Sequence, residues 1–406
     1  MSLIEENKER KNLHLKRESI NNLGETMLDQ DKSLSSYKKP LSDVPEESFT
    51  LPSYMYTDPA IFELEKEKIF YKTWQYVGHK SLFSKPGDYQ TLRICDQHIF
   101  VIMGDDYKLR AFYNVCQHRA HELLPEGFGN VARAIICPYH AWTYEKSGQL
   151  RGAPRSESRP SFNRDNFSLK PVRLEMFLDS AFINLDANAT ALSEIAGDLE
   201  EDIKKRVPFF DKLHKPQARF VADDLGLTKI NAGWKVVVDN YVECYHCDHA
   251  HPDFCDIISM DTYQHDTFGL WARQLGEDIK DDNTAYKLKP NDPFKKSAFW
   301  FLWPNTTINI LPGAEVLNFA IVRPTAIDKC LFEGHSISAT GEFHKGRQEY
   351  TANTLMPEDT ALCESVQKGL KSKGYNQGPL IADSKMSGRG EHALHHFHRL
   401  VQKTMA

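Results

Sequence analysis

The sequence lacks any apolar run that approaches the roughly 20 residues needed to span a bilayer, so no membrane-spanning helix is expected. Its first residues, MSLIEENKERKNLHLKRE, mix charges of both signs and lack the apolar core of a secretory signal. Together these two absences predict a cytoplasmic protein.

A basic stripe is also missing. The chain carries 50 Lys and Arg against 56 Asp and Glu, a net charge of -6, and no block rich in Lys or Arg. A nucleic-acid partner is therefore not expected. No GxGxxG fingerprint follows a predicted strand, which indicates that the chain does not itself take hydride from a nicotinamide cofactor.

Cysteine is scarce, with 8 residues among 406. In a reducing cytoplasm, thiols serve as metal ligands or pack in the core more often than they form a disulfide framework. We therefore expect metal-binding or buried cysteines, and the sequence around each one has to decide between the two.

Changes in composition divide the chain into four segments. They are residues 1–48, 49–74, 75–186 and 187–406. The first is polar and charged and is expected to be an N-terminal extension without a catalytic role. The second contains a predicted helix that leads into the rest of the chain, with Asp58 as its N-cap and Pro59 in its first position.

The third and fourth segments differ in their periodicity. The third alternates short β-branched runs with Gly, Pro and Asp turns, which predicts a small antiparallel β-domain. The fourth mixes strand-like runs with longer helical stretches, which include LSEIAGDLEEDIKKRV, residues 234–249 and residues 358–371. It predicts a larger α+β domain, so the fold class expected for the chain is α+β.

The third segment contains a Cys-x-His motif, Cys116 and His118, and a Cys-x-x-His motif, Cys137 and His140. Two thiolates and two imidazoles can hold Zn²⁺, but zinc fingers pair Cys with Cys and His with His. Here each arm supplies one of each. That order suits a Rieske centre, in which two His replace two Cys on one iron of a [2Fe–2S] cluster. The motifs therefore predict a one-electron carrier of raised potential.

A second group of potential ligands lies in the run NYVECYHCDHAHPDFC. Cys244 and Cys247 with nearby histidines could bind zinc, but no second cysteine pair follows at finger spacing. The other interpretation takes His246 and His251 as members of a 2-His-1-carboxylate triad, which leaves positions on Fe(II) open for O₂. Positions five apart diverge by about 140° on a regular helix, so the helix has to end or distort between them, as Pro252 also indicates.

Both motifs resemble those of Rieske-type non-haem iron oxygenases, and the resemblance extends over roughly residues 55–402. CxH…CPYHAW is similar to the cluster signature of ring-hydroxylating and related oxygenases, and NYVECYHCDHAHP to their mononuclear-iron motif. The resemblance implies a helix-grip-like catalytic domain. The ligands it implies are Cys116, His118, Cys137 and His140 for the cluster and His246 and His251 for the mononuclear iron.

The third iron ligand has to come from elsewhere, and the stretch MPEDTALCESVQKGL resembles the late helix that supplies it in this family. By that match the ligand is Asp359, with Glu358 as its rival. The resemblance further implies a head-to-tail homotrimer. It also implies a separate flavin and iron–sulfur reductase that passes on electrons from NAD(P)H.

Glu243 stands where the family usually carries an acid that bridges the mononuclear iron to the cluster of a neighbouring subunit. Members that resemble aromatic dioxygenases mostly have Asp there, and the string ECYHC is similar to the branch that acts on quaternary ammonium compounds. The resemblance therefore implies oxidation, with N-demethylation, of a small substrate such as glycine betaine, proline betaine or carnitine. A choline-type substrate could instead be oxidised at its alcohol carbon. An aromatic-ring hydroxylating dioxygenase would share every iron ligand and is the alternative.

A quaternary ammonium group is expected to bind in an aromatic cage, where ring faces attract the cation. The sequence offers candidates in AFWFLWPN and upstream of it, although a core position in a strand is the commoner role for each. The candidates are Tyr263, Trp271, Phe299, Trp300, Phe301 and Trp303.

Overall fold

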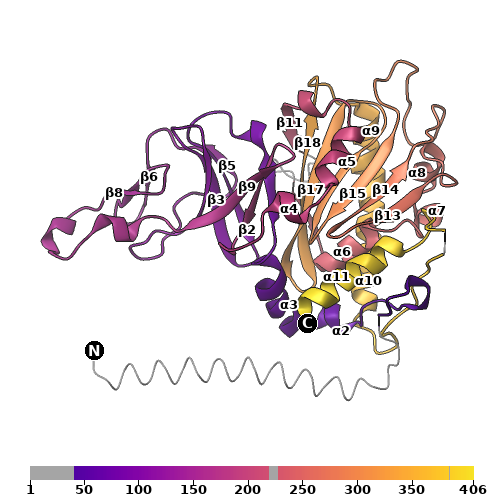
Figure 1. The fold of residues 1–406 in the computed structure, drawn as a ribbon, viewed down its shortest axis with the longest axis horizontal. Helices are drawn as coiled ribbons and strands as arrows, with labels where there is room; N and C mark the ends of the chain where they lie inside the picture. The colour runs from indigo at the N-terminus through magenta and orange to yellow at the C-terminus, as the bar shows by residue number, and fades with distance from the viewer. Residues whose placement is uncertain (1–40, 219–226, 384) are drawn as a thin grey trace.

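Figure 1 shows the computed structural model, which describes residues 41–218, 227–383 and 385–406. Most of the predicted N-terminal extension lies outside the described residues. The described chain is α+β, as predicted, with a β-rich part that leads into a larger part where helices pack against a sheet. Within the described ranges no helix is long and apolar enough to cross a membrane.

Short helices precede the first strand. They are α2 (Tyr54–Thr57), α3 (Pro59–Glu65) and a π-helical turn (Lys66–Phe70). Helix α3 begins as the sequence predicts, because the Asp58 carboxylate accepts a hydrogen bond from the Ala60 amide at 2.9 Å. Pro59 fits the first helical position because the amide hydrogen that it lacks would have no partner within the helix.

Seven antiparallel strands form the first sheet, in the order β1-β10-β9-β4-β3-β2-β5. Their bounds are β1 (Gln75–His79), β2 (Asp88–Ile94), β3 (Gln97–Met103), β4 (Leu109–Tyr113), β5 (Phe128–Asn130), β9 (Pro171–Phe177) and β10 (Ser180–Asn184). This sheet lies in the part of the chain for which an antiparallel β-domain is expected. Strands β1 and β10 are buried at every position, because the sheet continues into contacts with the second sheet.

A smaller three-stranded sheet, β6-β7-β8, projects from the first one at the left of Figure 1. Its strands are β6 (Ile135–Ile136), β7 (Thr143–Tyr144) and β8 (Leu150–Gly152). The loops that carry the two Cys–His motifs follow β4 and β6. We call this region, residues 116–121 and 135–167, the cluster lobe.

The second sheet follows the order β11-β18-β17-β16-β15-β14-β13, with β12 also paired to β18. The strands are β11 (Lys215–Ala218), β12 (Leu227–Ile230), β13 (Gln264–Thr267), β14 (Trp271–Gly276), β15 (Ser297–Leu302), β16 (Thr306–Ile310), β17 (Val316–Ala326) and β18 (Lys329–Ser338). The helices of this part are α4 (Leu192–Ile195), α5 (Leu199–Arg206), α6 (Trp234–Tyr241), α7 (Cys247–Ala250), α8 (Pro252–Ile257), α9 (Lys345–Tyr350), α10 (Met356–Gly369) and α11 (His392–Met405). Helix α6 packs against both α10 and β17, which places it between the sheet and the late helix.

The two large sheets are joined by buried contacts and share one hydrophobic core. Tyr76 of β1 stacks on Phe319 of β17 with ring centroids 5.2 Å apart, and Arg323 donates a hydrogen bond to the Tyr76 carbonyl at 2.8 Å. Gln90 of β2 donates to Glu333 of β18 at 3.1 Å. In this arrangement the cluster lobe lies on the opposite side of the folded molecule from helices α7 and α8 (Figure 1).

Helix α6 is anchored by buried polar contacts. Lys235 and Glu65 form an ion pair that is almost entirely buried, and the Trp234 indole donates to the same carboxylate at 2.8 Å. One turn later, Asp239 accepts a hydrogen bond from the Tyr56 hydroxyl at 2.7 Å. These contacts hold the helix whose C-terminal end leads directly into the motif NYVECYH.

Candidate functional site: two metal centres and an aromatic cavity

Two loops of the cluster lobe bring the predicted cluster ligands together. Cys116 and Cys137 are buried, whereas His118 is exposed and His140 is half-buried. The two imidazole centroids are 4.6 Å apart. Nδ1 of His140 is buried without a hydrogen-bond partner, an unusual state for a polar atom that is explained by a metal ligand. Inner thiols and outer imidazoles match the ligand order of a Rieske cluster.

The two ligand loops repeat one backbone geometry. Ala120 and Ala141 both have a φ of 57°, and each donates a hydrogen bond at 3.0 Å to the carbonyl of the cysteine that opens its loop. A left-handed backbone is unfavourable for Ala and persists only where the surroundings impose it. His118 stacks on Trp142 at a centroid distance of 4.8 Å, which fixes one ligand ring. The loops therefore form two equivalent tips that face each other.

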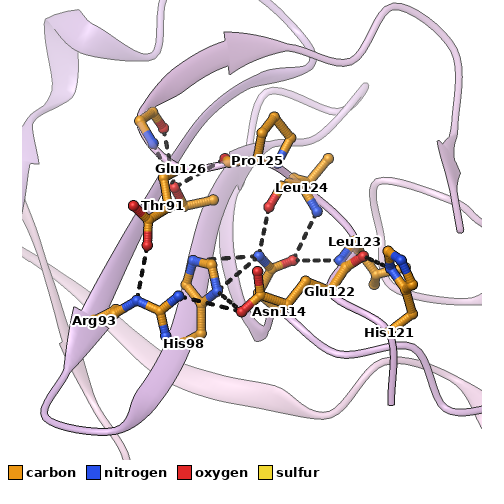
Figure 2. Close-up of polar contacts among 11 residues, drawn as sticks. Thr91, Arg93, His98, Asn114, His121, Glu122, Leu123, Leu124, Pro125 and Glu126 are labelled. Atoms are coloured by element: carbon orange, nitrogen blue, oxygen red, sulfur yellow. Dashed lines mark hydrogen bonds and ion pairs between the residues drawn. The ribbon is translucent and has the colours of Figure 1, made fainter. Parts of the chain in front are cut away.

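The segment after the first loop is held by a network around Asn114 and Glu122 (Figure 2). Asn114 accepts hydrogen bonds from the amides of Leu123 and Leu124 at 3.1 and 2.9 Å, and donates to the Leu124 carbonyl at 2.7 Å. Glu122 contacts Nδ1 of His98 at 2.8 Å. The network ties this segment to strand β3 and so fixes the first ligand loop.

The second group of potential ligands lies where α6 ends and two short helices follow. Helix α6 ends at Tyr241, α7 spans Cys247–Ala250, and α8 begins at Pro252. His246 precedes α7 and His251 follows it, with ring centroids 5.0 Å apart. No regular helix runs through both histidines, as their spacing predicts, and the break turns both imidazoles toward one point.

Asp359 on helix α10 completes a group of three potential ligands with His246 and His251. Its Oδ1 atom is 2.9 Å from Nε2 of His251 and 3.7 Å from Nε2 of His246. The three ligand atoms lie within 4.8 Å of one another. Two ring nitrogens and one carboxylate oxygen around a common point fit a 2-His-1-carboxylate iron site with open positions.

The other ring nitrogen of each histidine contacts a different carboxylate. Glu243 Oε1 is 2.5 Å from Nδ1 of His246, and Glu358 Oε2 is 2.8 Å from Nδ1 of His251. Carboxylates in this position fix the ring orientation of metal-binding histidines and raise their basicity. The arrangement separates Asp359, which faces the Nε2 atoms, from Glu358, which does not.

The charges around this group favour a cation. Burial lowers the pKa of His246, but the neighbouring carboxylates of Asp359 and Glu243 outweigh it and raise the pKa to about 10. Burial raises the pKa of Asp359, but the two histidines outweigh it and hold that pKa below its ordinary value. Both shifts arise from carboxylates packed against imidazoles, a grouping that attracts a positive ion.

Cys244 and Cys247 form a disulfide, with Cα atoms 5.0 Å apart. The expectation that the cysteines are metal ligands or buried thiols is therefore wrong for this pair. The reason is local, because the turn between α6 and α7 brings the two residues within the separation of about 4.4–6.8 Å that a disulfide requires. The other cysteines described are free, namely Cys95, Cys116, Cys137, Cys255, Cys330 and Cys363.

A cavity of about 130 Å³ borders the three iron-ligand candidates. Five aromatic residues line it: Tyr241, Phe254, Tyr263, Phe299 and Phe332. Tyr241 donates its hydroxyl to the Trp300 carbonyl at 3.2 Å, and Tyr263 donates its hydroxyl to the Gln274 side chain at 3.0 Å. Both hydroxyls are thus occupied within the protein, which leaves the rings to form the wall of the cavity.

Two of the six predicted cage residues, Tyr263 and Phe299, line this cavity. The prediction is wrong for the other four, which lie in hydrophobic cores: Trp271, Trp300, Phe301 and Trp303. Successive side chains of a strand point to opposite faces, so Phe299 and Trp300 of β15 cannot share one site. Phe301 packs further along the strand against Phe397, with ring centroids 5.6 Å apart.

Three wall residues were not predicted from the sequence. Tyr241 and Phe254 lie close to Glu243 and His251 in the chain, within the same motif, and that proximity is a usable signal. Phe332 comes from strand β18, far along the chain, and nothing in its sequence neighbourhood indicates a place beside the iron ligands.

Two protein-family models match the chain. The Rieske [2Fe-2S] domain matches residues 73–163, and the ring hydroxylating alpha subunit (catalytic domain) matches residues 210–406. The fold and the two sites thus define an oxygenase subunit in which a Rieske domain is joined to a mononuclear-iron catalytic domain.

Proteins of similar sequence and structure belong to the same class of oxygenase. The carnitine monooxygenase oxygenase subunit of Escherichia coli (strain K12) is 40% identical over 362 residues, which cover 88% of this chain and 94% of the relative. The choline monooxygenase of Atriplex hortensis is 29% identical and covers 87% of this chain and 77% of the relative. A crystal structure of the quaternary ammonium Rieske monooxygenase CntA with L-carnitine superposes with a TM-score of 0.80 at 36% identity, over 91% of this chain and 99% of that one.

The chain belongs to the Rieske-type non-haem iron oxygenases. It is an oxidoreductase, the oxygenase subunit of a monooxygenase, and its cofactors are a Rieske [2Fe–2S] cluster and a mononuclear iron that uses O₂. A naphthalene 1,2-dioxygenase from Rhodococcus has a TM-score of 0.71 at 19% identity and shares the fold alone.

Proposed function

We propose that this chain is the terminal oxygenase of a multicomponent monooxygenase that oxidises a small quaternary ammonium compound, such as glycine betaine, proline betaine or carnitine. Electrons come from NAD(P)H through a flavin and iron–sulfur reductase. The observation that carries the proposal is the aromatic-walled cavity beside the three iron-ligand candidates. Ring faces attract a cation that offers no hydrogen-bond donor, as a quaternary ammonium does.

The residues have distinct proposed roles. The cluster would be held by Cys116, His118, Cys137 and His140, and the iron by His246, His251 and Asp359. When bound, these cofactors supply electrons one at a time and activate O₂. Residues 75–186 are assigned to the Rieske domain and residues 187–406 to the catalytic domain.

The protein's own contribution is to orient and to exclude water. Tyr263, Phe254 and Phe299 lie within 6.5 Å of one another by ring centroid and enclose one side of the cavity. A carbon next to the cationic nitrogen is thereby held beside the iron ligands. Hydroxylation there uses one O₂, two electrons and two protons, and releases one water. The resulting alcohol loses its hydroxyl proton and breaks its C–N bond, which gives a neutral amine and a carbonyl compound.

We further propose a head-to-tail homotrimer in which Glu243 of one subunit meets the cluster lobe of the next. Charge complementarity supports this arrangement. Exposed arginines of the lobe are Arg119, Arg151, Arg155, Arg159 and Arg164. Acidic residues around α8 and α10 are Asp253, Asp261, Glu358 and Glu364. Each face also exposes apolar residues, with Ile136 and Tyr139 on the lobe and Tyr245 and Leu362 near the iron ligands.

The deciding experiment supplies the purified chain with a compatible reductase and NADH, and measures formaldehyde or free amine released from glycine betaine, proline betaine and carnitine. Release of either product supports the proposal. Formation of cis-diols from naphthalene, without turnover of any ammonium compound, would establish the alternative, an aromatic-ring hydroxylating dioxygenase.

Phe299→Leu tests the cage directly, because it keeps an apolar side chain and removes the ring. Loss of one cation–π contact, worth about 1–2 kcal/mol, raises KM for the ammonium substrate roughly tenfold with little change in kcat. Phe301→Leu is the matched control, since it changes the same residue type on the same strand, within the core. Equal effects of the two variants on KM would contradict the cage.

A further inference from the structure

The disulfide between Cys244 and Cys247 encloses one of the iron-ligand candidates. His246 lies between the two cysteines in the chain, and Sγ of Cys247 is 3.9 Å from its Nε2 atom. That nitrogen is also the one that faces Asp359. The sulfur atoms therefore lie beside the part of the site where O₂ is expected to react.

The two cysteines are almost fully buried. Cys244 is 3% exposed and Cys247 is 4% exposed, and both border the aromatic cavity. A small oxidant formed in this cavity would therefore arise next to these sulfurs. Among the other described cysteines, Cys363 also borders the cavity but has no disulfide partner.

The disulfide also closes the turn between α6 and α7. Within that turn the Glu243 carboxylate accepts a hydrogen bond from the Tyr245 amide at 2.5 Å and contacts Nδ1 of His246 at 2.5 Å. The same few residues thus carry the proposed electron bridge, an iron ligand and a thiol pair. An oxidant that escaped the reaction would meet the imidazole and the thiols together.

We propose that Cys244 and Cys247 are a peroxide-reactive thiol pair that protects His246, and that the disulfide is its oxidised state. Two thiols react with one hydrogen peroxide. The O–O bond breaks, the S–S bond forms, and both thiol hydrogens leave in two molecules of water. The peroxide arises when two electrons and two protons reduce O₂ at the site without oxidation of a substrate. A small dithiol reductant, which can enter the cavity that both cysteines border, restores the thiols by disulfide exchange. This inference rests on the proposed function, since the peroxide comes from an oxygen-activating iron.

The test begins with the full-length holoenzyme, reduced anaerobically with dithiothreitol, desalted and treated with hydrogen peroxide. After alkylation and digestion with trypsin, residues 236–273 form one peptide that contains Cys244, Cys247 and Cys255. The expected result is a disulfide between Cys244 and Cys247, with Cys255 still alkylated as the internal control. Thiols that stay alkylated, equal oxidation of Cys255, or a disulfide that dithiothreitol does not reduce would each overturn the inference.

A variant pair tests the protective role. In air, with reductase and NADH but no substrate, Cys244→Ala with Cys247→Ala should accumulate oxidised His246 several-fold faster than the wild type, as measured by peptide mass. Cys255→Ala should match the wild type. Visible absorbance of the cluster reports whether each variant is folded. Equal oxidation of His246 in all three proteins overturns protection. The formaldehyde assay with substrate decides the proposed function separately, so an active enzyme without peroxide-dependent disulfide formation refutes this inference alone.

Discussion

At the scale of single residues, the adjacent carboxylates Glu358 and Asp359 have different partners and hence different expected roles. Asp359 faces Nε2 of His251 at 2.9 Å, while Glu358 contacts Nδ1 of the same ring at 2.8 Å. Asp359→Ala should therefore abolish retention of the mononuclear iron. Glu358→Ala should weaken iron binding by about 10–100-fold, the usual effect of removing a group that orients a ligand.

Iron content per chain after dialysis, measured beside the visible absorbance of the cluster, separates the two variants. The cluster absorbance is the control, because neither substitution touches the cluster lobe. If Asp359→Ala retained the iron and Glu358→Ala lost it, the assignment of the third ligand would be reversed.

His265 on β13 makes stability depend on pH. Burial lowers its pKa to about 4 and His392 lowers it too, against the opposing effects of Gln274, Asp266 and Asp383. The unfolded chain has a histidine pKa of about 6.5, so it binds a proton that the folded chain excludes as pH falls from about 6.5 to 4. The free energy of unfolding should drop across that window, by up to about 3 kcal/mol.

Urea unfolding at about pH 7 and about pH 5 measures this effect. His265→Gln should lose the corresponding part of the pH dependence, whereas substitution of the exposed His214 should retain it. An unchanged pH dependence in His265→Gln would show that other groups cause it.

The roles of single residues could be predicted from the sequence where the residues stand close together in one short motif. The cluster motifs and the His246–His251 pair stand in short runs of sequence, and spacing alone predicted the break in the helix between the histidines. The choice between Glu358 and Asp359 depends on which ring nitrogen each carboxylate reaches, and only the fold determines that. The disulfide between Cys244 and Cys247 was not predicted, because free thiols were expected in a reducing cytoplasm. The short turn that brings the two cysteines together is a feature of the fold.

At the scale of elements, the buried pair of Lys235 and Glu65 anchors α6. Glu65→Gln leaves Lys235 charged, buried and without its carboxylate, which should reduce the free energy of unfolding by about 3–5 kcal/mol. Glu200→Gln is the control, because it disrupts an exposed pair with Lys204 at 2.7 Å and should cost less than about 0.5 kcal/mol. Equal losses in urea unfolding of the two variants would contradict the anchoring role.

The elements themselves were predicted better than their arrangement. The run LSEIAGDLEEDIKKRV forms helices as expected, but as α4 and α5, because Gly197 adopts a φ of 58° and interrupts the helix between them. Helix α10 covers most of the predicted stretch 358–371. Strand order, by contrast, depends on pairings such as β1 with β10, whose partners are far apart in sequence and leave no local pattern. The same limit explains why Phe332 of β18 was missed.

At the scale of the whole molecule, the proposed trimer predicts that electrons cross between subunits. Cys116→Ser, which should lack the cluster, and Asp359→Ala, which should lack the iron, are each expected to be inactive alone. Co-expressed with different tags and purified as mixed trimers, they should recover about a third of the wild-type rate, because one of the three contacts in each mixed trimer pairs an intact lobe with an intact iron site. No recovery in mixed trimers would place electron transfer within one chain.

The cluster lobe lies at the opposite end of the molecule from helices α7 and α8, which flank the iron-ligand candidate His251 (Figure 1). The two sheets between them are joined by a shared core. A solitary chain would therefore accept electrons at one end and hold its substrate at the other. Under the proposed trimer, the rate per chain therefore depends on how much protein the cell makes, because the subunits of an oligomer dissociate as their concentration falls. In a cell that makes few chains, the total rate of substrate oxidation would be lower than the number of chains alone predicts. As the number of chains rises, the total rate would increase more than proportionally.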